Sequence, residues 1–183
     1  MPVSMAGRAE RANAIRAHIL VAAERLFAEH GVYVVANRQI SEAAGQSNNA
    51  TVTYHFGTKA DLVRAIARKH GKQIERVRER MLERPPGSDD VRDWVACLVR
   101  PVTEHLAAKG NPTWFARFGA QVMTDPALHE VMIDGALTSS SLVRIPDGLN
   151  RCLPDLPLPV RAERKHMTST LRGAGISGEI SNG

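Results

Sequence analysis

The sequence is poor in aromatic residues and has no long apolar run. Phenylalanine, tryptophan and tyrosine make up 4% of the 183 residues, while 43% are hydrophobic, so the core must consist mostly of aliphatic side chains. No stretch reaches the roughly 18 consecutive apolar residues that suggest a membrane-spanning helix. No apolar stretch follows the early basic residue Arg8, as it would in a signal peptide. We therefore expect a cytoplasmic protein without a membrane partner.

Residue combinations that support catalysis or bind metal are also missing. The two cysteines, Cys97 and Cys152, lie far apart in sequence, and no histidine stands at ligand spacing from another histidine or a cysteine. There is no nucleophile–base pair, no paired carboxylates and no glycine-rich phosphate loop. The sequence predicts a protein that is not an enzyme, with reduced cysteines, no metal site and no cofactor.

Positive charge is concentrated in the first half of the chain. Residues 1–84 contain 14 Lys and Arg and 8 Asp and Glu, a net charge of +6, whereas residues 85–183 contain the remaining 10 and 11, a net charge of −1. A basic segment of this kind attracts polyanions such as nucleic acid. Arginine-rich solvated helices have the same composition, so charge alone leaves both interpretations open.

Helical periodicity dominates the sequence. An apolar stripe predicts a helix over 14–30, with Gly31 at the left-handed position after its end. Asn37 is the expected N-cap of a second helix that ends at Gly45. Ser47 is the expected N-cap of a short third helix, which runs through Thr51 to about Tyr54.

A fourth helix is expected to begin at Thr58, which forms a reciprocal cap with Asp61, and to stop before Pro85. The Pro-Pro-Gly-Ser segment 85–88 is the best domain boundary. It separates a head at 1–57 and a connecting helix at 58–84 from a body at 85–183.

The body is also predicted to be helical. Its first apolar stripe is interrupted by Pro101, where we expect a kink, and Asn111-Pro112 and Asp125-Pro126 each resemble an N-cap followed by a first-turn proline. Apolar residues keep helical spacing over 142–152, and a last helix is expected over 160–172. No strand pattern is present, so the predicted fold is all-α.

The segment between the second and third helices predicts a helix-turn-helix. Ala43 and Ala44 are small enough for close helix approach, and Gly45 permits a sharp turn. Short polar side chains that can donate and accept hydrogen bonds follow the turn, as suits base edges and phosphates in a major groove. A solvated loop with local caps would have the same composition. These side chains are Gln46, Ser47, Asn48, Asn49, Thr51 and Thr53.

Three motifs follow one another in the first half of the chain: Gly31-Val32-Tyr33, Ile40-x-x-Ala43-Ala44-Gly45 and Tyr54-His55-Phe56-Gly57-x-Lys59-x-x-Leu62. In this order and spacing they resemble the DNA-binding head of the tetracycline-repressor (TetR) family over about residues 14–75. Two departures, Gln46 after the turn glycine and one extra residue before Tyr54, match a subgroup with a Gln-x-Asn-Asn…Tyr-His-Phe region.

The resemblance implies that residues 46–53 face the major groove and that Tyr54 and His55 lie against the DNA backbone. It also implies that Lys59 meets a phosphate, and helix-end electrostatics agree with this. Asn37 and Arg38 are further expected phosphate partners. Phe56 is expected to fill the core rather than to enter the DNA.

The resemblance further implies that the body binds a small-molecule effector and forms a homodimer. Core packing is the alternative explanation for each expected effector-binding residue. Of the two closing helices typical of the family, only 160–171 is visible, so the C-terminal end is expected to be short. The expected effector residues are Trp94, Cys97, His105, Trp114, Phe115, Phe118, Met123 and Met132.

These expectations combine into a mechanism. A two-fold dimer would place its heads in successive major grooves of a palindromic operator, roughly 34–36 Å apart. An unidentified effector that favours another head spacing would release this repressor from double-stranded DNA. The alternative is a helical module that binds a small molecule or a protein and does not bind DNA.

Overall fold

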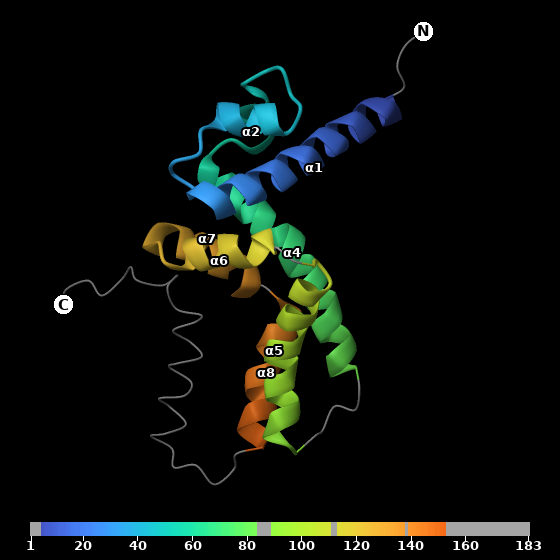
Figure 1. Cartoon of the computed structure of the whole chain (residues 1–183). Coiled ribbons are helices and arrows are strands. Elements are labelled where there is room, and N and C mark those ends of the chain that lie inside the picture. The colour runs from blue at the N-terminus through green and yellow to red at the C-terminus, as the bar shows by residue number, and fades with distance from the viewer. Residues whose placement is uncertain (1–4, 84–88, 111–112, 138, 153–183) are drawn as a thin grey trace, which may run out of the picture. The chain divides into compact units, whose positions relative to one another are not determined.

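The computed structural model describes residues 5–83, 89–110, 113–137 and 139–152. All regular elements in these ranges are α-helices, which confirms the all-α prediction (Figure 1). The expected boundary at 85–88, the Asn111-Pro112 cap and the helix at 160–172 lie outside the described residues. The helices are α1 (Met5–His30), α2 (Asn37–Ala43), α3 (Thr51–Phe56), α4 (Lys59–Leu82), α5 (Val91–Ala107), α6 (Trp114–Met123), α7 (Pro126–Leu137) and α8 (Ser140–Arg151).

The chain divides into two compact units that are not continuous in sequence. The first contains residues 1–69 and 109–131, and the second contains residues 70–108 and 132–183. Both α4 and α7 pass from one unit into the other. The predicted boundaries at 57 and 84 separate segments with different functional roles. The division into compact units does not test such roles, so these boundaries stay predictions.

The core of the first unit forms where α1 packs against α6. Phe27 and Phe118 are fully buried, and their rings stack with centroids 6.3 Å apart. Gln121 Nε2 donates to the carbonyl of Ala28 at 3.0 Å, and so supplies a partner near the end of α1. Gly31 then ends α1 with φ of +92°, as predicted.

The caps of α2, α6 and α7 only partly follow the sequence-based expectations. Asn37 is the first residue of α2 and not its N-cap; Ala36 takes that place, and its amide donates to Gln39 Oε1 at 2.7 Å. Gln39 fills the reciprocal position, so the helix starts without a capping side chain at Ala36. Thr113 precedes α6. Asp125 caps α7 as predicted, because its Oδ1 accepts from the amides of Ala127 and Leu128 at 3.0 Å.

The second unit has its core between α5, α8 and the end of α4. Leu82, Trp94, Cys97 and Ile145 form this buried cluster. Gly148 lies against Trp94 so closely that an added Cβ would stand 2.3 Å from the indole ring. Only glycine fits this position of α8 without a shift of the tryptophan.

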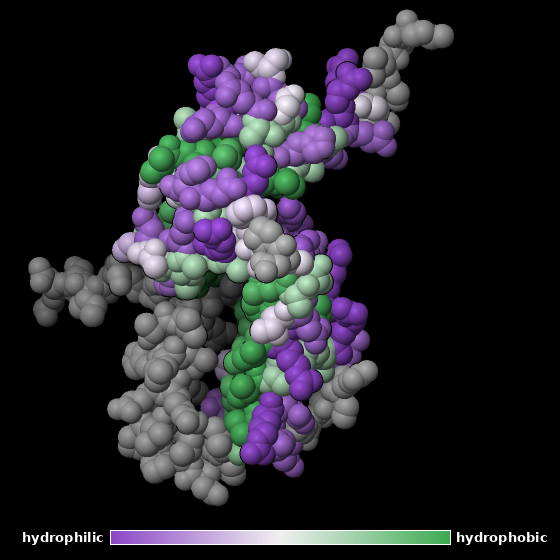
Figure 2. Space-filling view, viewed as in Figure 1, coloured by the Kyte–Doolittle hydropathy of each residue, from purple (hydrophilic) through white to green (hydrophobic). Residues whose placement is uncertain are grey.

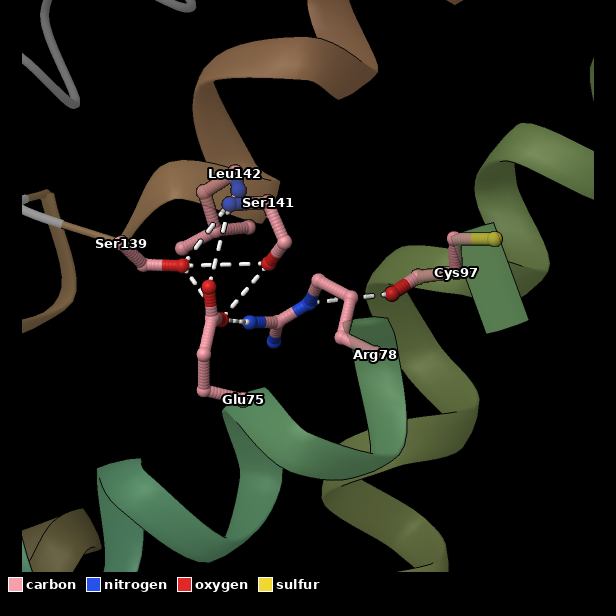
Figure 3. A network of polar contacts seen from close by, with 6 residues as sticks. All are labelled: Glu75, Arg78, Cys97, Ser139, Ser141 and Leu142. Carbon is pink, nitrogen blue, oxygen red and sulfur yellow. Dashed lines mark hydrogen bonds and ion pairs between the residues drawn. The ribbon is translucent and has the colours of Figure 1, made fainter. Parts of the chain in front are cut away.

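A polar network joins three helices of the second unit (Figure 3). The Glu75 carboxylate on α4 accepts hydrogen bonds from the hydroxyl groups of Ser139 and Ser141 and from the Ser141 amide, at the start of α8. Arg78 donates to the same carboxylate at 2.9 Å and to the carbonyl of Cys97 on α5 at 3.1 Å. Burial by itself would raise the pKa of Glu75, but the hydrogen bonds from Ser139 and Ser141 and the charge of Arg78 together lower it.

α5 also presents apolar side chains to the exterior. Val95, Leu98, Val99 and Val102 are all exposed, by 44%, 37%, 52% and 36%. Apolar residues gather on the surface along α5 in Figure 2. Their spacing of three and four residues places them on one face of the helix. We call these four residues the α5 row.

Candidate nucleic-acid interface

Backbone hydrogen bonds fix the turn at the end of α2. The amide of Gln46 donates to Ser41 O at 2.8 Å, and the amide of Gly45 donates to Glu42 O at 3.0 Å. This pair of bonds is the Schellman arrangement, which needs a left-handed residue at Gly45, where φ is +70°. The predicted role of Gly45 in the sharp turn is confirmed.

Asn48, rather than Ser47, organises the start of α3. The Asn48 side-chain oxygen accepts from the amide of Ala50 at 2.9 Å, and its backbone oxygen accepts from the amide and the hydroxyl of Thr51 at 3.1 Å and 2.7 Å. Asparagine commonly forms such turns because its side chain imitates a backbone carbonyl. The expected Ser47 cap is wrong, since the N-cap of α3 is Ala50.

The polar side chains expected in the major groove therefore fall into two groups. Gln46, Asn48 and Thr51 have local partners; Gln46 Nε2 turns back to the carbonyl of Ala44 at 3.2 Å. Ser47 and Asn49 are exposed, and within the described part of the chain their side chains have no hydrogen bond. These two side chains keep all their donors and acceptors for another molecule.

The two helices also meet through a pair of polar side chains. Asn37 Nδ2, on the first residue of α2, donates to Thr53 Oγ1 on α3 at 3.2 Å. Thr53 is exposed, whereas Asn37 is half-buried. Arg38, the next residue, is exposed and forms an ion pair within α2 with Glu42 at 2.7 Å.

The end of α3 combines an exposed tyrosine with a buried anchor. Tyr54 is 83% exposed, and its ring meets that of His55 edge-on with centroids 5.1 Å apart. Phe56 is buried, as expected for a core residue. Arg16 on α1 donates to the carbonyl of His55, and its guanidinium lies 4.3 Å from the centre of the Phe56 ring. Arg16 thus anchors the end of α3 to α1.

Arg16 was not among the residues expected at this site. It precedes Ile19 by one helical turn and so lies beside the apolar stripe of α1, which is the single sequence signal for an inward position. Arginine is otherwise a common solvated residue. Nothing local links it to residue 55, which lies 39 positions away.

The start of α4 is capped as predicted. The Thr58 hydroxyl accepts from the Asp61 amide at 3.1 Å, and Asp61 Oδ2 accepts from the Thr58 amide at 3.2 Å and from its hydroxyl at 2.6 Å. These hydrogen bonds from Thr58 lower the pKa of Asp61. Arg64 adds an ion pair to the other carboxylate oxygen at 2.5 Å.

Lys59, expected at a phosphate, is held by the loop after α1. Its ammonium donates to the carbonyls of Val32 and Tyr33 at 3.0 Å and 3.1 Å. An ammonium has three N–H donors. One donor therefore remains for a further acceptor, and the two carbonyls fix where it points.

The expected effector residues are distributed over both compact units. In the first, Phe115 and Phe118 have ring centroids 6.3 Å apart within the core, Trp114 lies below Arg117, and Met123 is exposed. In the second, Trp94 and Cys97 share the buried cluster, and burial raises the pKa of the Cys97 thiol.

His105 and Met132 complete the expected set in the second unit. The His105 Nε2 atom lies 2.8 Å from Nδ1 of the buried His70, and Met132 is half-buried. The structure therefore brings together two pairs of the expected residues, Phe115 with Phe118 and Trp94 with Cys97. Both pairs are part of packed cores.

Among the described residues, none of the helices is both long and apolar enough to span a bilayer. Within the same residues, histidine, cysteine, aspartate and glutamate do not gather in groups of three or more suited to a metal ion.

The helix-turn-helix is similar to segments of known regulatory proteins. Residues 19–66 match the model for bacterial regulatory proteins of the tetR family. The HTH-type transcriptional repressor AcnR of Corynebacterium glutamicum is 40% identical over 62 residues, which cover 34% of this chain and 32% of that protein. AcnR of Corynebacterium efficiens is 41% identical over 59 residues, covering 32% and 31%. The match thus spans about a third of the length of these relatives.

A solved structure resembles a larger part of the chain. The multidrug binding protein EbrR, crystallised with imidazole, superposes with a TM-score of 0.50 over 86% of this chain and 76% of its own, at 23% identity. This likeness concerns the fold. The match to the family model over residues 19–66 and this likeness of fold agree with the helix-turn-helix observed there and with the helices of the described residues.

Proposed function

We propose that this protein is a sequence-specific DNA-binding transcriptional regulator, and that it is a cytoplasmic repressor released by a small molecule. The observation that carries the proposal is an exposed polar surface formed by the turn before α3 and by α3 itself. Ser47, Asn49 and Thr53 are exposed on a segment whose backbone is held by the Gly45 turn and by Arg16. Such rigid presentation is what base recognition in a major groove requires.

Phosphate contacts would come from residues that follow this polar surface in the sequence. Tyr54 is exposed on α3, and Lys59 keeps one ammonium donor at the start of α4. Phosphate oxygens accept such bonds and thereby position a protein on the duplex without regard to sequence. The net charge of +6 over residues 1–84 adds a general attraction to DNA.

We also propose that the chain belongs to the TetR-family subgroup with a Gln-x-Asn-Asn…Tyr-His-Phe region, because residues 46–56 contain this pattern.

We further propose a homodimer on a palindromic operator. Two copies related by a two-fold axis would place two α3 helices in grooves one helical turn apart. A two-fold interface must be self-complementary. The α5 row supports this, since an exposed apolar face can pair with its own copy.

The proposed effector acts on the second half of the chain. EbrR is described as a multidrug binding protein, and we extend small-molecule binding from that fold to this chain. A compound that binds one conformation of the dimer better than the DNA-bound one must weaken DNA binding by the same factor.

Selection of bound sequences from a random duplex pool tests the proposal. We expect recovery of a two-fold symmetric motif whose half-sites are centred about 10 base pairs apart, or a multiple of that spacing. Affinity for this motif should fall steeply as salt rises. Recovery of no sequence preference at low salt would refute DNA recognition and favour a helical module that binds another ligand.

A further inference from the structure

The hydrogen bond between Asn37 and Thr53 gives an exposed hydroxyl a fixed orientation. A threonine within a helix commonly turns its hydroxyl to a carbonyl three or four residues earlier. Thr51 does this, since its hydroxyl lies 2.7 Å from the carbonyl of Asn48. Thr53 instead has its oxygen 3.2 Å from Asn37 Nδ2, sixteen positions away on α2. Its side-chain rotamer is therefore set by the neighbouring helix.

This contact also sets the hydrogen-bonding character of Thr53. An amide N–H is a donor, so the Thr53 oxygen acts as the acceptor in this bond. Among the described residues the hydroxyl proton has no acceptor, so it can donate to a partner outside the protein. In the major groove, the partners of a donor are purine N7, guanine O6 and thymine O4, whereas cytosine N4 and adenine N6 are donors themselves.

Asparagine at position 37 is not the residue that would stabilise α2 best. Its Oδ1 is buried and has no hydrogen-bond partner among the described residues, and such an oxygen costs free energy. An acidic residue in the first turn would interact better with the positive end of the helix. A side chain retained at such a cost is typical of a functional position.

We propose that Asn37 is a positioning residue for base recognition. It fixes the Thr53 hydroxyl as a hydrogen-bond donor and thereby sets the preference at one base pair of each half-site for a base that presents an acceptor. This rests on the proposed function, in which α3 enters the major groove. It assigns Asn37 a role in specificity in addition to the phosphate contact expected from the sequence.

The test compares base preferences, obtained by random-pool selection, for the full-length protein and five variants. Asn37→Ala and Thr53→Val should both reduce discrimination at the same base pair, by roughly 3- to 10-fold for one neutral hydrogen bond. The double variant should match Thr53→Val alone, because Asn37 acts through Thr53. Thr51→Val, the matched control, removes a hydroxyl that bonds locally and should leave that base pair unaffected.

Asn37→Asp gives the sharpest result. A carboxylate only accepts, so the Thr53 hydroxyl would donate to it and offer its lone pairs to the DNA. Preference at that base pair should then move toward adenine N6 or cytosine N4, while the melting temperature stays equal or rises. This variant keeps the size of the side chain and carries the test if Asn37→Ala does not fold.

The outcomes separate this inference from the proposed function. If the wild-type protein selects no motif, the proposed function and this inference both fail. If it selects a motif but Asn37→Ala weakens binding equally for every base, or changes a base pair that Thr53→Val does not, the positioning role is refuted while DNA recognition stands.

Discussion

Arg78 Nε donates a hydrogen bond to the carbonyl of Cys97, and this carbonyl lies four residues before Pro101. In an uninterrupted helix the residue at 101 would supply an amide to that oxygen, but proline has none. The buried guanidinium replaces the missing donor. α5 continues through Pro101 from Val91 to Ala107, and a side chain from α4 supplies the donor that proline lacks. The kink expected at Pro101 stays a prediction.

This relationship predicts the effect of removing Arg78. Arg78→Met should lower the free energy of unfolding by about 2–3 kcal/mol, because it leaves Cys97 O without a donor and Glu75 without its ion pair. Pro101→Ala restores a backbone amide at position 101. In the Arg78→Met background it should therefore lower the free energy of unfolding by less than it does in the wild type, the difference being about 1 kcal/mol. Urea denaturation measures both; Arg76→Ala, at an exposed site of α4, is the control.

The Glu75 carboxylate should make the stability of the fold depend on pH. Its pKa is lowered in the folded state, so it stabilises the fold fully above the ordinary glutamate pKa and loses this contribution as pH falls through the lowered value. Melting temperatures measured from neutral pH downward should therefore decline less for Glu75→Gln than for the wild type. Asp61→Asn reports the contribution of Asp61, whose pKa is also lowered. If the melting temperature of Glu75→Gln declined with pH as steeply as that of the wild type, the stabilising role of the Glu75 hydrogen bonds would be contradicted.

Lys59 and Asn49 should affect DNA binding in different ways. Lys59→Ala should weaken binding to all sequences alike and reduce the slope of log affinity against log salt by about 0.9, one phosphate contact. Asn49→Ala should change the preferred base at one position, because its exposed amide can pair with a base edge. Asn48→Ala should instead loosen the start of α3.

Fluorescence anisotropy over a panel of duplexes and salt concentrations distinguishes these variants. Arg68→Ala, exposed on α4, controls for loss of positive charge. Identical behaviour of Lys59→Ala and Asn49→Ala across the panel would show that the division into phosphate and base contacts is wrong.

Two glycines within helices make a matched pair. Gly148→Ala should destabilise the protein by about 1–3 kcal/mol, because the new Cβ would stand 2.3 Å from the Trp94 ring. Gly71→Ala, in α4, meets no atom within 4 Å and should stabilise by about 0.5–1 kcal/mol. Thermal unfolding followed by circular dichroism gives both values, and shifts of the same sign would contradict the packing of α8 on Trp94.

Local features of the site were predictable from the sequence because the interacting atoms lie within a few residues. The helix end at Gly31, the turn at Gly45 and the cap formed by Thr58 and Asp61 depend on bonds that span three to five positions. Steric and hydrogen-bonding preferences of these residue types act at that range. The order of helices in the head followed from the same local signals.

Predictions failed where two local solutions compete. Asn37 and Ser47 are both good N-cap residues, yet Gln39 and Asn48 provide the bonds instead. The composition of each segment permits either choice, because the alternatives differ by about 1 kcal/mol or less. Packing of α2 and α3 then selects among them.

The sequence by itself determined the all-helical structure of the described residues, a helix-turn-helix at 37–56 and a basic first half. Only the tertiary structure decided that Arg16 supports α3, that Asn37 orients Thr53 and that Arg78 completes α5 across Pro101. These contacts join residues 16 to 39 positions apart on different helices. A pattern of spacing along one helix contains no information on which polar side chain of another helix it will meet.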